Sequence, residues 1–258
     1  MLFDTHTHIY LCTKHQEKEI IDGMKQNQVS KIVSIWVDLD SSKISINLAK
    51  AYPNIVYSSV WIHPNDCKDL NLLETIWELE KMILENKKQI VAIWETGFDF
   101  YHDDRENTLE NQENFFKSQI FLAKKYNLPF IVHSRNAKKD TLRVLKECNY
   151  NNFILHCFSE DLEFALECIN FAPNCKISFS WIVTYKSALS IQETAWNIPL
   201  KNIIIETDCP FLSPQEVRGQ ENIPEYIRYI LKKIIELRQL NWKSESGEEI
   251  ENIFMKIV

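Results

Sequence analysis

The sequence predicts an α/β fold of the (β/α)8 TIM barrel type, formed as a single domain by residues 1–258. Short runs of aliphatic and β-branched residues alternate, eight times in succession, with longer segments of helical period. The length of 258 residues suits one such barrel, which commonly takes about 250. A doubly wound open sheet would alternate in the same way, but it usually has fewer strands and a glycine-rich first turn. The sequence contains no G-x-G-x-x-G or Walker A motif, so the barrel is favoured.

Each expected element follows from its local pattern. The strands are short apolar runs, expected at Leu2–His8, Lys31–Val37, Ile55–Ile62, Ile90–Glu95, Pro129–His133, Phe153–His156, Lys176–Ser180 and Asn202–Glu206. The helices have apolar residues at helical spacing and are expected near residues 15–27, 42–51, 70–86, 108–126, 138–147, 161–170, 186–197 and 223–239. One more helical segment, Gly247–Ile257, is expected to close the chain.

The composition indicates a globular cytoplasmic protein. Apolar residues make up 45% and charged residues 25% of the chain, and no window approaches the roughly 18 uninterrupted apolar residues of a membrane helix. The start, MLFDTHTHIY, has an acid and two histidines where a signal peptide needs a basic region and an apolar run. The seven cysteines are odd in number and widely spaced without a C-x-x-C pair, which is not the pattern of a disulfide framework or a thiolate zinc site. The net charge of −7 argues against a broad basic nucleic-acid surface, although not against phosphate binding through metal ions and a few cations.

Residues that can ligate a metal ion stand where the expected strands end. Active sites of these barrels are built at the carboxyl ends of the strands. Five strands contribute such residues, namely His6, His8, Glu95, His133, His156 and Asp208. The two histidines of the first strand are two residues apart, so their side chains point the same way and can bind one ion. Asp4 has the same parity and lies one residue pair deeper, as a residue that supports the ligands.

Each of these residues also has a plainer interpretation. The first-strand histidines could be hydrogen-bonded packing residues, and His133 and His156 could be satisfied core histidines. Glu95 ends a strongly apolar strand, where a buried carboxylate must be paired, neutral or metal-bound, and Arg135 is a candidate partner. Asp208 could be a turn residue, which T-D-C-P would suit. The presence of all six at strand ends favours metal ligation.

Eight motifs occur in an order that matches a known family. They are D-x-H-x-H, W-x-H-P, E-T-G-F-D-F, H-S-R-N-A, H-C-F-S-E-D, I-S-F-S-W-I-V-T-Y, E-T-D-C-P-F-L and R-G-Q-E-N-I-P. The chain thereby resembles the TatD family of metal-dependent deoxyribonucleases, in the amidohydrolase superfamily, over essentially its whole length. Asn136 departs from the family, which usually has Asp at this place in H-S-R-N-A. The change removes a negative charge near His133, and we expect a modest effect on that ligand.

The resemblance implies a distorted TIM barrel with two divalent cations at its mouth, for which magnesium, manganese and zinc are all compatible. It assigns one cation to His6, His8, Glu95 and Asp208, and the second to Glu95, His133 and His156. It also implies that His63 and Arg218 contact the phosphate of the substrate. As alternatives, His63 could be a structural histidine beside Pro64, and Arg218 could be solvated.

The activity implied by the resemblance is hydrolysis of phosphodiester bonds in DNA, at strand ends or in single strands. Two cations would lower the pKa of a bridging water and neutralise charge on the phosphate. Asp208 would orient that water and accept its proton, and the water would attack phosphorus in line so that the 3′ or 5′ oxygen leaves. The small number of phosphate-binding cations favours a strand end or short single strand over a long duplex. No membrane and no stable protein partner are implied.

Five further residues near these motifs have less defined roles. The aromatic rings of Phe98, Phe100 and Tyr101 could stack on a base or pack in the core and rim. Cys157 and Cys209 stand at motif positions where the family uses no thiolate chemistry, and we expect both to be packing residues.

Two rival functions stay open because fold and metal centre alone do not fix the substrate. One is an ester or amide hydrolase of the same superfamily, since TatD family members have also been credited with removing D-aminoacyl groups from transfer RNA. The other is a barrel without catalysis that acts as a binding protein. The intact set of six ligand candidates argues against the second rival.

Glycine is several-fold rarer than expected. The chain has 4 glycines and 7 tryptophans, whereas average usage gives roughly 18 glycines in this length. Against the family pattern, tryptophan stands where glycine is usual at Trp61, Trp94 and Trp181, and also at Trp36 and Trp242. One hypothesis is that the source organism reads UGA as glycine, while the sequence was translated with a table that reads it as tryptophan. Otherwise the tryptophans are genuine and narrow the mouth of the site.

Overall fold

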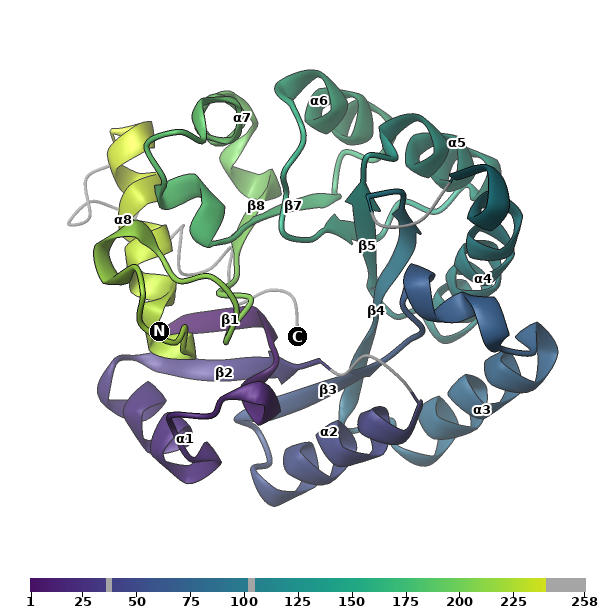
Figure 1. Cartoon of the computed structure of the whole chain (residues 1–258), viewed down its shortest axis with the longest axis horizontal. Helices are drawn as coiled ribbons and strands as arrows, with labels where there is room; N and C mark the ends of the chain where they lie inside the picture. The colour runs from purple at the N-terminus through teal and green to yellow at the C-terminus, as the bar shows by residue number, and fades with distance from the viewer. Residues whose placement is uncertain (36–38, 102–104, 240–258) are drawn as a thin grey trace. The chain divides into compact units, whose positions relative to one another are not determined.

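The computed structural model describes residues 1–35, 39–101 and 105–239. Within these ranges, eight parallel strands alternate with eight α-helices, and the strands follow one another in the sheet in chain order from β1 to β8 (Figure 1). The residues cluster into two compact units. Of the described residues, the first unit comprises those in 1–34, 157–166 and 176–239, and the second comprises those in 35–156 and 167–175. Each unit contains four of the strands.

The bounds of the elements confirm the eight predicted pairs of strand and helix. The strands are β1 (Leu2–Thr7), β2 (Val29–Ser34), β3 (Val56–Val60), β4 (Ile90–Asp99), β5 (Phe130–Arg135), β6 (Phe153–Leu155), β7 (Lys176–Phe179) and β8 (Ile203–Ile205). The helices are α1 (Glu17–Gln26), α2 (Leu39–Ala51), α3 (Leu72–Glu85), α4 (Arg105–Tyr126), α5 (Lys138–Cys148), α6 (Leu162–Phe171), α7 (Leu189–Asn197) and α8 (Ile227–Arg238). The expected helix at Gly247–Ile257 and the end of the second expected strand, Val37, lie outside the described residues.

The first unit is built around four strands in the order β7, β8, β1 and β2. Strands β1 and β2 pair in parallel, as do β7 and β8. The loop after β8 continues alongside β1, where the backbone N–H of His8 donates to the carbonyl of Cys209 at 2.7 Å and that of Asp208 donates to the carbonyl of His6 at 3.0 Å. These two bonds bring the residues that follow β1 and β8 together at the carboxyl ends of their strands.

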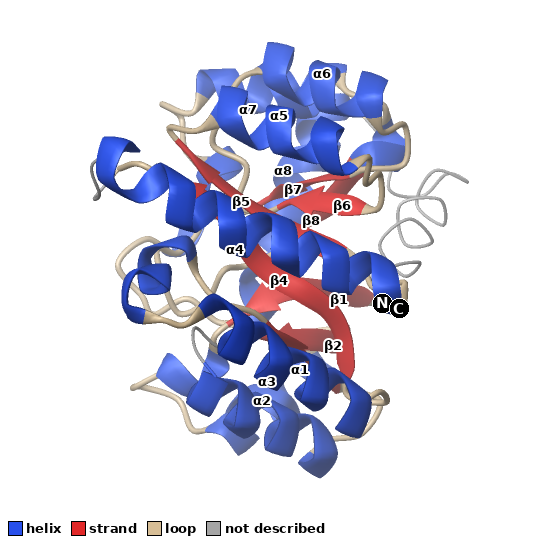
Figure 2. Ribbon diagram, turned by 90° about the vertical axis from the view of Figure 1, so that its right-hand side faces the viewer, coloured by secondary structure: helices blue, strands red, loops and turns tan. Residues whose placement is uncertain are grey.

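The second unit is built around β3, β4, β5 and β6, which pair in parallel in that order. Helix α4 packs against β4 (Figure 2). The register of β4 against β5 shifts between Ile93 and Thr96, so that β4 contains an irregularity in its middle. Glu95 lies in this shift and has a φ of 53°, in the left-handed region. The chain then returns to extended backbone and β4 continues to Asp99.

The helices form where apolar residues recur at helical spacing. In α8 the buried residues are Ile227, Ile230, Leu231 and Ile234, one stripe of an amphipathic helix. Helix α3 begins at an Asn71 cap, whose side chain accepts from the backbone N–H of Glu74 at 3.1 Å and so satisfies a free donor of the first turn. Within the described residues, no helix combines the length and apolarity that a membrane crossing requires.

Gly97 allows β4 and β5 to approach closely beside a predicted metal ligand. It pairs with His133 across the two strands and has a φ of 151°. A Cβ at this position would lie 2.0 Å from the backbone carbonyl oxygen of His133. Because the atom it meets is backbone, one of the two strands would have to shift. We therefore expect Gly97→Ala to destabilise the fold by about 3 kcal/mol, from overpacking and backbone strain together.

Urea unfolding of the purified protein measures this effect. Gly219→Ala is the matched control, because Gly219 also has a positive φ, of 89°, but has no atom within 4 Å of an added Cβ. The control should lose only about 1 kcal/mol, the steric cost of a left-handed non-glycine residue. Equal losses in the two variants would contradict the role of close packing at Gly97.

Candidate metal centre

Three predicted ligands converge in the first unit. The Nε2 atoms of His6 and His8 are 2.9 Å apart, and Oδ1 of Asp208 lies 3.5 Å from the first and 3.8 Å from the second. Ligand atoms that share one ion at about 2.1 Å lie roughly 3 to 3.5 Å from one another. Both histidines are buried, and the Asp208 side chain is 14% exposed. Two imidazoles and a carboxylate at this spacing therefore fit a divalent cation.

Asp4 supports this cluster through hydrogen bonds to the backbone beside it. Its carboxylate accepts from the backbone N–H of Thr207 at 2.9 Å and of His6 at 3.3 Å, and it also bonds the Thr207 hydroxyl. Burial raises the pKa of Asp4 to about 8, against the opposing effect of these hydrogen bonds. The residue thus links β1 to the loop after β8 and fixes the backbone of both ligand-bearing segments, as expected for a supporting residue.

Glu206 and Cys157 complete the surroundings of Asp208 and were not assigned such roles from the sequence. The Glu206 carboxylate accepts from the backbone N–H of Cys157 at 2.6 Å and from the Ser178 hydroxyl at 2.6 Å. The Cys157 thiol lies 3.2 Å from Oγ of Ser180 and 3.7 Å from Oδ2 of Asp208. The prediction of a packing role holds for Cys209, which is buried, but Cys157 also contacts a predicted ligand.

A second group of ligands converges in the second unit. Nε2 of His156 lies 3.0 Å from Oε1 of Glu95, and Nδ1 of His133 lies 4.0 Å from the same oxygen. The side chains of His63, Glu95 and His133 also offer ligand atoms within 4.8 Å of one another. Glu95 and His156 are each 8% exposed. A carboxylate surrounded by imidazole nitrogens at these distances is suited to hold a divalent cation.

Asp99 orients His133 and is a functional residue that the sequence interpretation missed. Its Oδ2 lies 3.2 Å from Nε2 of His133, so the opposite ring nitrogen, Nδ1, is the one on the side of Glu95. Burial alone would raise the pKa of Asp99, but the hydrogen bond with His133 and one from the backbone of Tyr101 outweigh it and lower the pKa to about 2. A carboxylate on the far nitrogen of a histidine is the usual support of a metal ligand. The apolar strand around Asp99 was the available signal, because a charge there needs a partner.

His63 presents a neutral imidazole to the second cluster. Its Nδ1 accepts from the backbone N–H of Asn65 at 3.2 Å, which caps the short helix Pro64–Asp69. Burial, reinforced by His133, lowers the pKa of His63 to about 4. A neutral histidine whose Nδ1 accepts must carry its proton on Nε2. The ring can therefore donate a hydrogen bond from Nε2, which an anionic substrate could accept.

Several expectations about these segments are corrected by the structure. Glu95 does not end β4 but lies in its middle, because the left-handed backbone at Glu95 breaks the alternation that the pattern assumed. Likewise β5 continues two residues past His133, to Arg135. Arg135 lies 3.8 Å over the ring of Tyr101, whereas Glu95 faces His156 and His133.

The aromatic residues after β4 have different environments. Phe98 is fully buried and packs against Phe116 with ring centroids 5.3 Å apart, so it belongs to the core and cannot stack on a base. Phe100 lies beside Phe98, whereas Tyr101 is 58% exposed. Asn136 is exposed and has a φ of 57°, a conformation that asparagine tolerates well. Asparagine in place of the family's usual aspartate is therefore compatible with the turn after β5.

Left-handed backbone recurs at the predicted ligands. Glu95 has a φ of 53°, Asp208 of 57° and Cys157, directly after His156, of 40°. Non-glycine residues in this region cost about 1 to 3 kcal/mol each, and such residues concentrate at functional sites. Two of the three residues are predicted ligands and the third directly follows one, which supports the assignment of these segments to a site.

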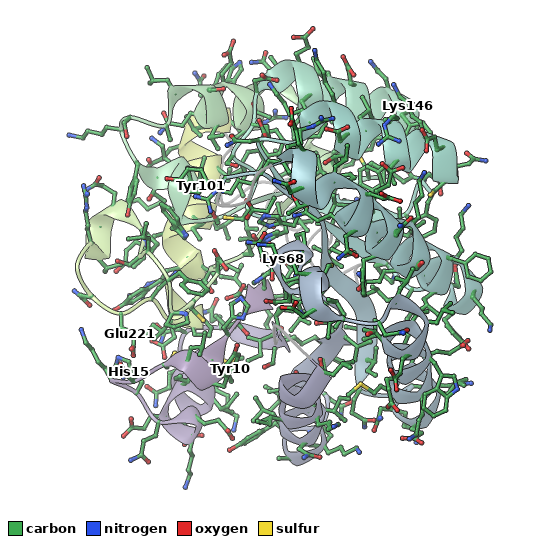
Figure 3. The ribbon with its side chains drawn as sticks, turned by 45° about the vertical axis from the view of Figure 1, so that its right-hand side comes forward. Tyr10, His15, Lys68, Tyr101, Lys146 and Glu221 are labelled. Carbon is green, nitrogen blue, oxygen red and sulfur yellow. The ribbon has the colours of Figure 1, made fainter. Side chains whose placement is uncertain are left out.

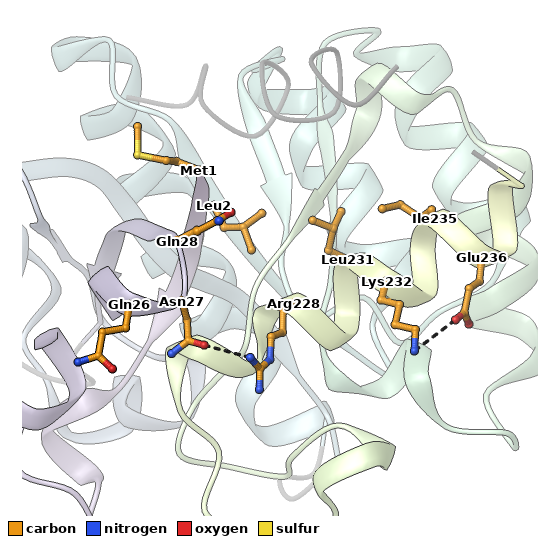
Figure 4. Close-up of a pocket in the computed structure, with 10 residues that line it drawn as sticks. All are labelled: Met1, Leu2, Gln26, Asn27, Gln28, Arg228, Leu231, Lys232, Ile235 and Glu236. Atoms are coloured by element: carbon orange, nitrogen blue, oxygen red, sulfur yellow. Dashed lines mark hydrogen bonds and ion pairs between the residues drawn. The ribbon is translucent and has the colours of Figure 1, made fainter. Parts of the chain in front are cut away.

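Arg218 lies in the first unit, beside a cavity of about 600 Å³ that opens among the loops after β1, β7 and β8. Its guanidinium is 5.3 Å from the ring centroid of Tyr185. A second cavity of similar size, about 590 Å³, lies between the start of β1, the end of α1 and α8 (Figure 4). Its charged groups are paired with near neighbours, since Arg228 donates to Asn27 at 3.0 Å and Lys232 lies 3.9 Å from Glu236. Of these two cavities among the described residues, the first adjoins a predicted ligand, through the contact of Phe211 with His8.

The three tryptophans at expected glycine positions are described by the structure, whereas Trp36 and Trp242 lie outside the described residues. Trp61 and Trp94 are fully buried, and none of the three has a positive φ. The indole N–H groups of Trp61 and Trp181 are buried without a hydrogen-bond partner among the described residues. Leaving such a donor unpaired costs about 1 to 3 kcal/mol, which supports the recoding hypothesis.

The recoding hypothesis predicts UGA codons at positions 61, 94 and 181, and a lower intact mass for the protein purified from its native host. It also predicts that Trp61→Gly leaves the free energy of unfolding unchanged or raises it. If the tryptophan is genuine, the same change should cost about 3 to 5 kcal/mol by opening a cavity. Trp77→Ala on α3 is the surface control, because the Trp77 side chain is 58% exposed. Alanine is used there in place of glycine because glycine weakens helices. UGG codons at the three positions would refute the hypothesis.

Comparisons with known proteins identify the family to which the chain is similar. A family model described as TatD related DNase matches residues 3–257. The chain is 34% identical over 255 residues to YabD of Bacillus subtilis, an uncharacterized metal-dependent hydrolase, covering 98% of this chain and 97% of that one. It is 30% identical over 243 residues to YcfH of Escherichia coli K12, also an uncharacterized metal-dependent hydrolase, covering 92% and 88% of the two chains.

Two solved structures confirm the fold class. The crystal structure of YJJV, a TatD homologue of Escherichia coli, matches with a TM-score of 0.88 at 24% identity, over 99% of this chain and 95% of that one. The phosphotriesterase homology protein of Escherichia coli matches with a TM-score of 0.71 at 13% identity, over 100% and 98% of the two chains. The prediction of a (β/α)8 barrel is thereby confirmed.

Proposed function

Because the chain belongs to the TatD family of metal-dependent hydrolases, we propose that it is a deoxyribonuclease that hydrolyses phosphodiester bonds at strand ends or in single-stranded DNA. One observation carries the proposal. Phe211 contacts His8, with ring centroids 5.3 Å apart, and also lines the cavity that contains Arg218 and Lys14. A cation-binding cluster therefore adjoins groups that attract a phosphate. We place the activity in the cytoplasm, as the wide spacing of the cysteines without a C-x-x-C pair favours.

Two divalent cations, magnesium, manganese or zinc, are part of the proposal. His6, His8 and Asp208 would hold one of them, and His133 and His156 would hold the other, with Glu95 as a ligand of both as the family resemblance implies. When bound, such ions lower the pKa of coordinated water and neutralise charge that builds on a phosphate.

Three side chains of this protein have defined roles in the proposed reaction. Asp208 directs Oδ1 toward the two histidines, and we assign to its carboxylate the acceptance of the proton of the attacking water. The water oxygen forms a bond to phosphorus as the bond to the 3′ or 5′ oxygen breaks, and that oxygen takes a proton from solvent, to which Asp208 afterwards returns the proton it accepted. His63 donates from Nε2 to a phosphate oxygen, and Arg218 neutralises phosphate charge. The products are a phosphate monoester and a free hydroxyl.

The structural neighbours are compatible with phosphate chemistry but also include the rival class. The phosphotriesterase homology protein carries phosphate in its active site. A dihydroorotase of Campylobacter jejuni has the same fold, with a TM-score of 0.60 at 13% identity. Since such likeness shows the fold alone, substrate class rests on the groups around the metal centre.

Product mapping on end-labelled single-stranded DNA tests the proposal. The same preparation is assayed on the DNA, on a D-aminoacyl ester of transfer RNA and on a cyclic amide, each with and without EDTA. We expect shortened DNA fragments, lost on chelation and restored by added divalent ions, and turnover of the other two substrates at least about 100-fold slower. Cleavage of the ester or amide with intact DNA would contradict the proposal, and so would DNA cleavage that survives EDTA.

A further inference from the structure

The cavity beside His8 has walls suited to a nucleotide. Its volume of about 600 Å³ is within the range of about 300 to 1,000 Å³ of small-molecule sites. The cavity is lined by aromatic and apolar side chains and by two cationic side chains. Among the lining residues are Trp181, Tyr185, Phe211 and Leu212, and the cations Lys14 and Arg218. These residues follow β1, β7 and β8, at the carboxyl ends of the strands, where barrel enzymes bind substrates.

Phe211 offers a free aromatic face next to the metal-binding cluster. The side chain is 51% exposed, and its contact with His8 is edge to face, with the rings 71° apart. The exposed face of a phenylalanine ring buries no apolar area when the protein folds. A planar base stacked on that face would remove it from water. Leu212, 59% exposed, extends the same apolar wall.

Tyr185 holds Arg218 at the cavity. The Tyr185 hydroxyl donates to the backbone carbonyl of Ser213 at 2.9 Å, which fixes the ring against the loop after β8. The guanidinium of Arg218 rests 5.3 Å from the ring centroid, a cation–π arrangement that keeps a mobile side chain near one place. Arg218 itself is exposed, so its donors remain accessible to a phosphate.

Glu221 is the one carboxylate among the described residues that line the cavity, and its charge is engaged locally. It accepts from the backbone N–H and the hydroxyl of Thr13 at 2.8 and 2.9 Å, and from the backbone N–H of Lys14 at 3.0 Å. Burial alone would raise the pKa of Glu221, but these bonds, with His15 nearby (Figure 3), lower it. Glu221 therefore secures the segment that carries Lys14, and two cations dominate the cavity of a chain whose net charge is −7.

We propose that this cavity is a subsite for the terminal nucleotide of single-stranded DNA, with its base stacked on Phe211 and a phosphate held by Arg218 and Lys14. The inference rests on the proposed function and adds a binding preference to it. Stacking on Phe211 uses the π-face that every base has, so the subsite accepts all four bases. Phe211, Tyr185 and Arg218 form this subsite whichever residue occupies position 181.

Fluorescence of 2-aminopurine measures the stacking directly. Two short single-stranded oligonucleotides with phosphorothioate linkages carry this base at the 5′ or the 3′ end, and each is titrated with the metal-loaded protein. We expect quenching with one of the two probes, and about 10-fold weaker binding by Phe211→Ala, the loss typical of one stacked base. Phe121→Ala on α4, at a side chain 66% exposed, is the matched control and should bind as wild type does.

Steady-state kinetics on unmodified single-stranded DNA gives the second readout. Phe211→Ala should raise KM by about the same factor as Kd, with a smaller change in kcat, and Arg218→Gln should raise KM and weaken its dependence on salt. If wild type cleaves DNA while Phe211→Ala matches the control in Kd and KM, the subsite is refuted and the nuclease assignment stands. If wild type neither binds nor cleaves DNA, both the subsite and the proposed function are refuted.

Discussion

Replacement of Asp208 by Asn is expected to reduce kcat for DNA cleavage by about 10³-fold. Asparagine has nearly the same size, but its amide cannot accept a proton from water at neutral pH and is a weaker cation ligand. Oδ1 of Asp208 lies 3.5 Å from His6 Nε2 and 3.8 Å from His8 Nε2, so the change also removes the negative charge that these imidazoles share. Single-turnover cleavage of labelled DNA, with saturating manganese and then with magnesium, measures the loss.

Asp22→Asn is the matched control for this variant. Asp22 lies on α1 with 54% of its side chain exposed, and the control should retain wild-type kcat. Thermal unfolding of Asp208→Asn should resemble that of wild type in the absence of metal, because the backbone bonds of residue 208 are unchanged. A kcat within about 3-fold of wild type would contradict the role of Asp208 as the proton acceptor.

Replacement of Glu95 by Gln is expected to have the largest effect on metal binding. Mutation of a residue that only supports a metal ligand commonly weakens metal affinity by about 10- to 100-fold. Removal of the charge of a ligand itself should therefore weaken the affinity by more than this. Oε1 of Glu95 is the atom toward which His156 Nε2 and His133 Nδ1 both converge, at 3.0 and 4.0 Å. Removal of its charge takes away the anion that lies between these two imidazoles, although Asp99 remains on Nε2 of His133.

Metal content after dialysis, measured by mass spectrometry, tests this prediction together with activity. Wild type should retain more divalent metal per chain than Glu95→Gln, and DNA cleavage should fall in parallel. Glu85→Gln, at an exposed position on α3, should behave as wild type does. If Glu95→Gln kept the full metal content, Glu95 would not be a ligand in either cluster.

The sequence predicted the architecture well because periodicity reports burial directly. Runs such as that of β8, whose residues Ile203, Ile204 and Ile205 are all fully buried, are recognisable without any knowledge of partners. The histidines and acids at strand ends were recognisable for the same reason, since polar residues are conspicuous in apolar runs. His6, His8 and Asp208 could therefore be proposed together, and the structure places their side chains together.

What the sequence could not show is local backbone geometry. The register shift at Glu95 arises from pairing between β4 and β5, which are about 35 residues apart, so the strand was expected to end where it continues. Asp99 was missed as the partner of His133 for this reason, because it lies in the unexpected extension of β4. The tautomer of His63 depends on one backbone N–H, that of Asn65, and only the turn after β3 determines it.

Cleavage of single-stranded DNA in H₂¹⁸O shows whether this chain uses water to break a phosphorus–oxygen bond. Mass spectrometry of the products determines where the heavy oxygen is incorporated. We expect one ¹⁸O atom in the phosphate monoester formed by each single cleavage and none in the product that carries the free hydroxyl, with no incorporation when EDTA is present. Phosphate products without ¹⁸O, or ¹⁸O found only in the acid released from an ester or amide substrate, would contradict it.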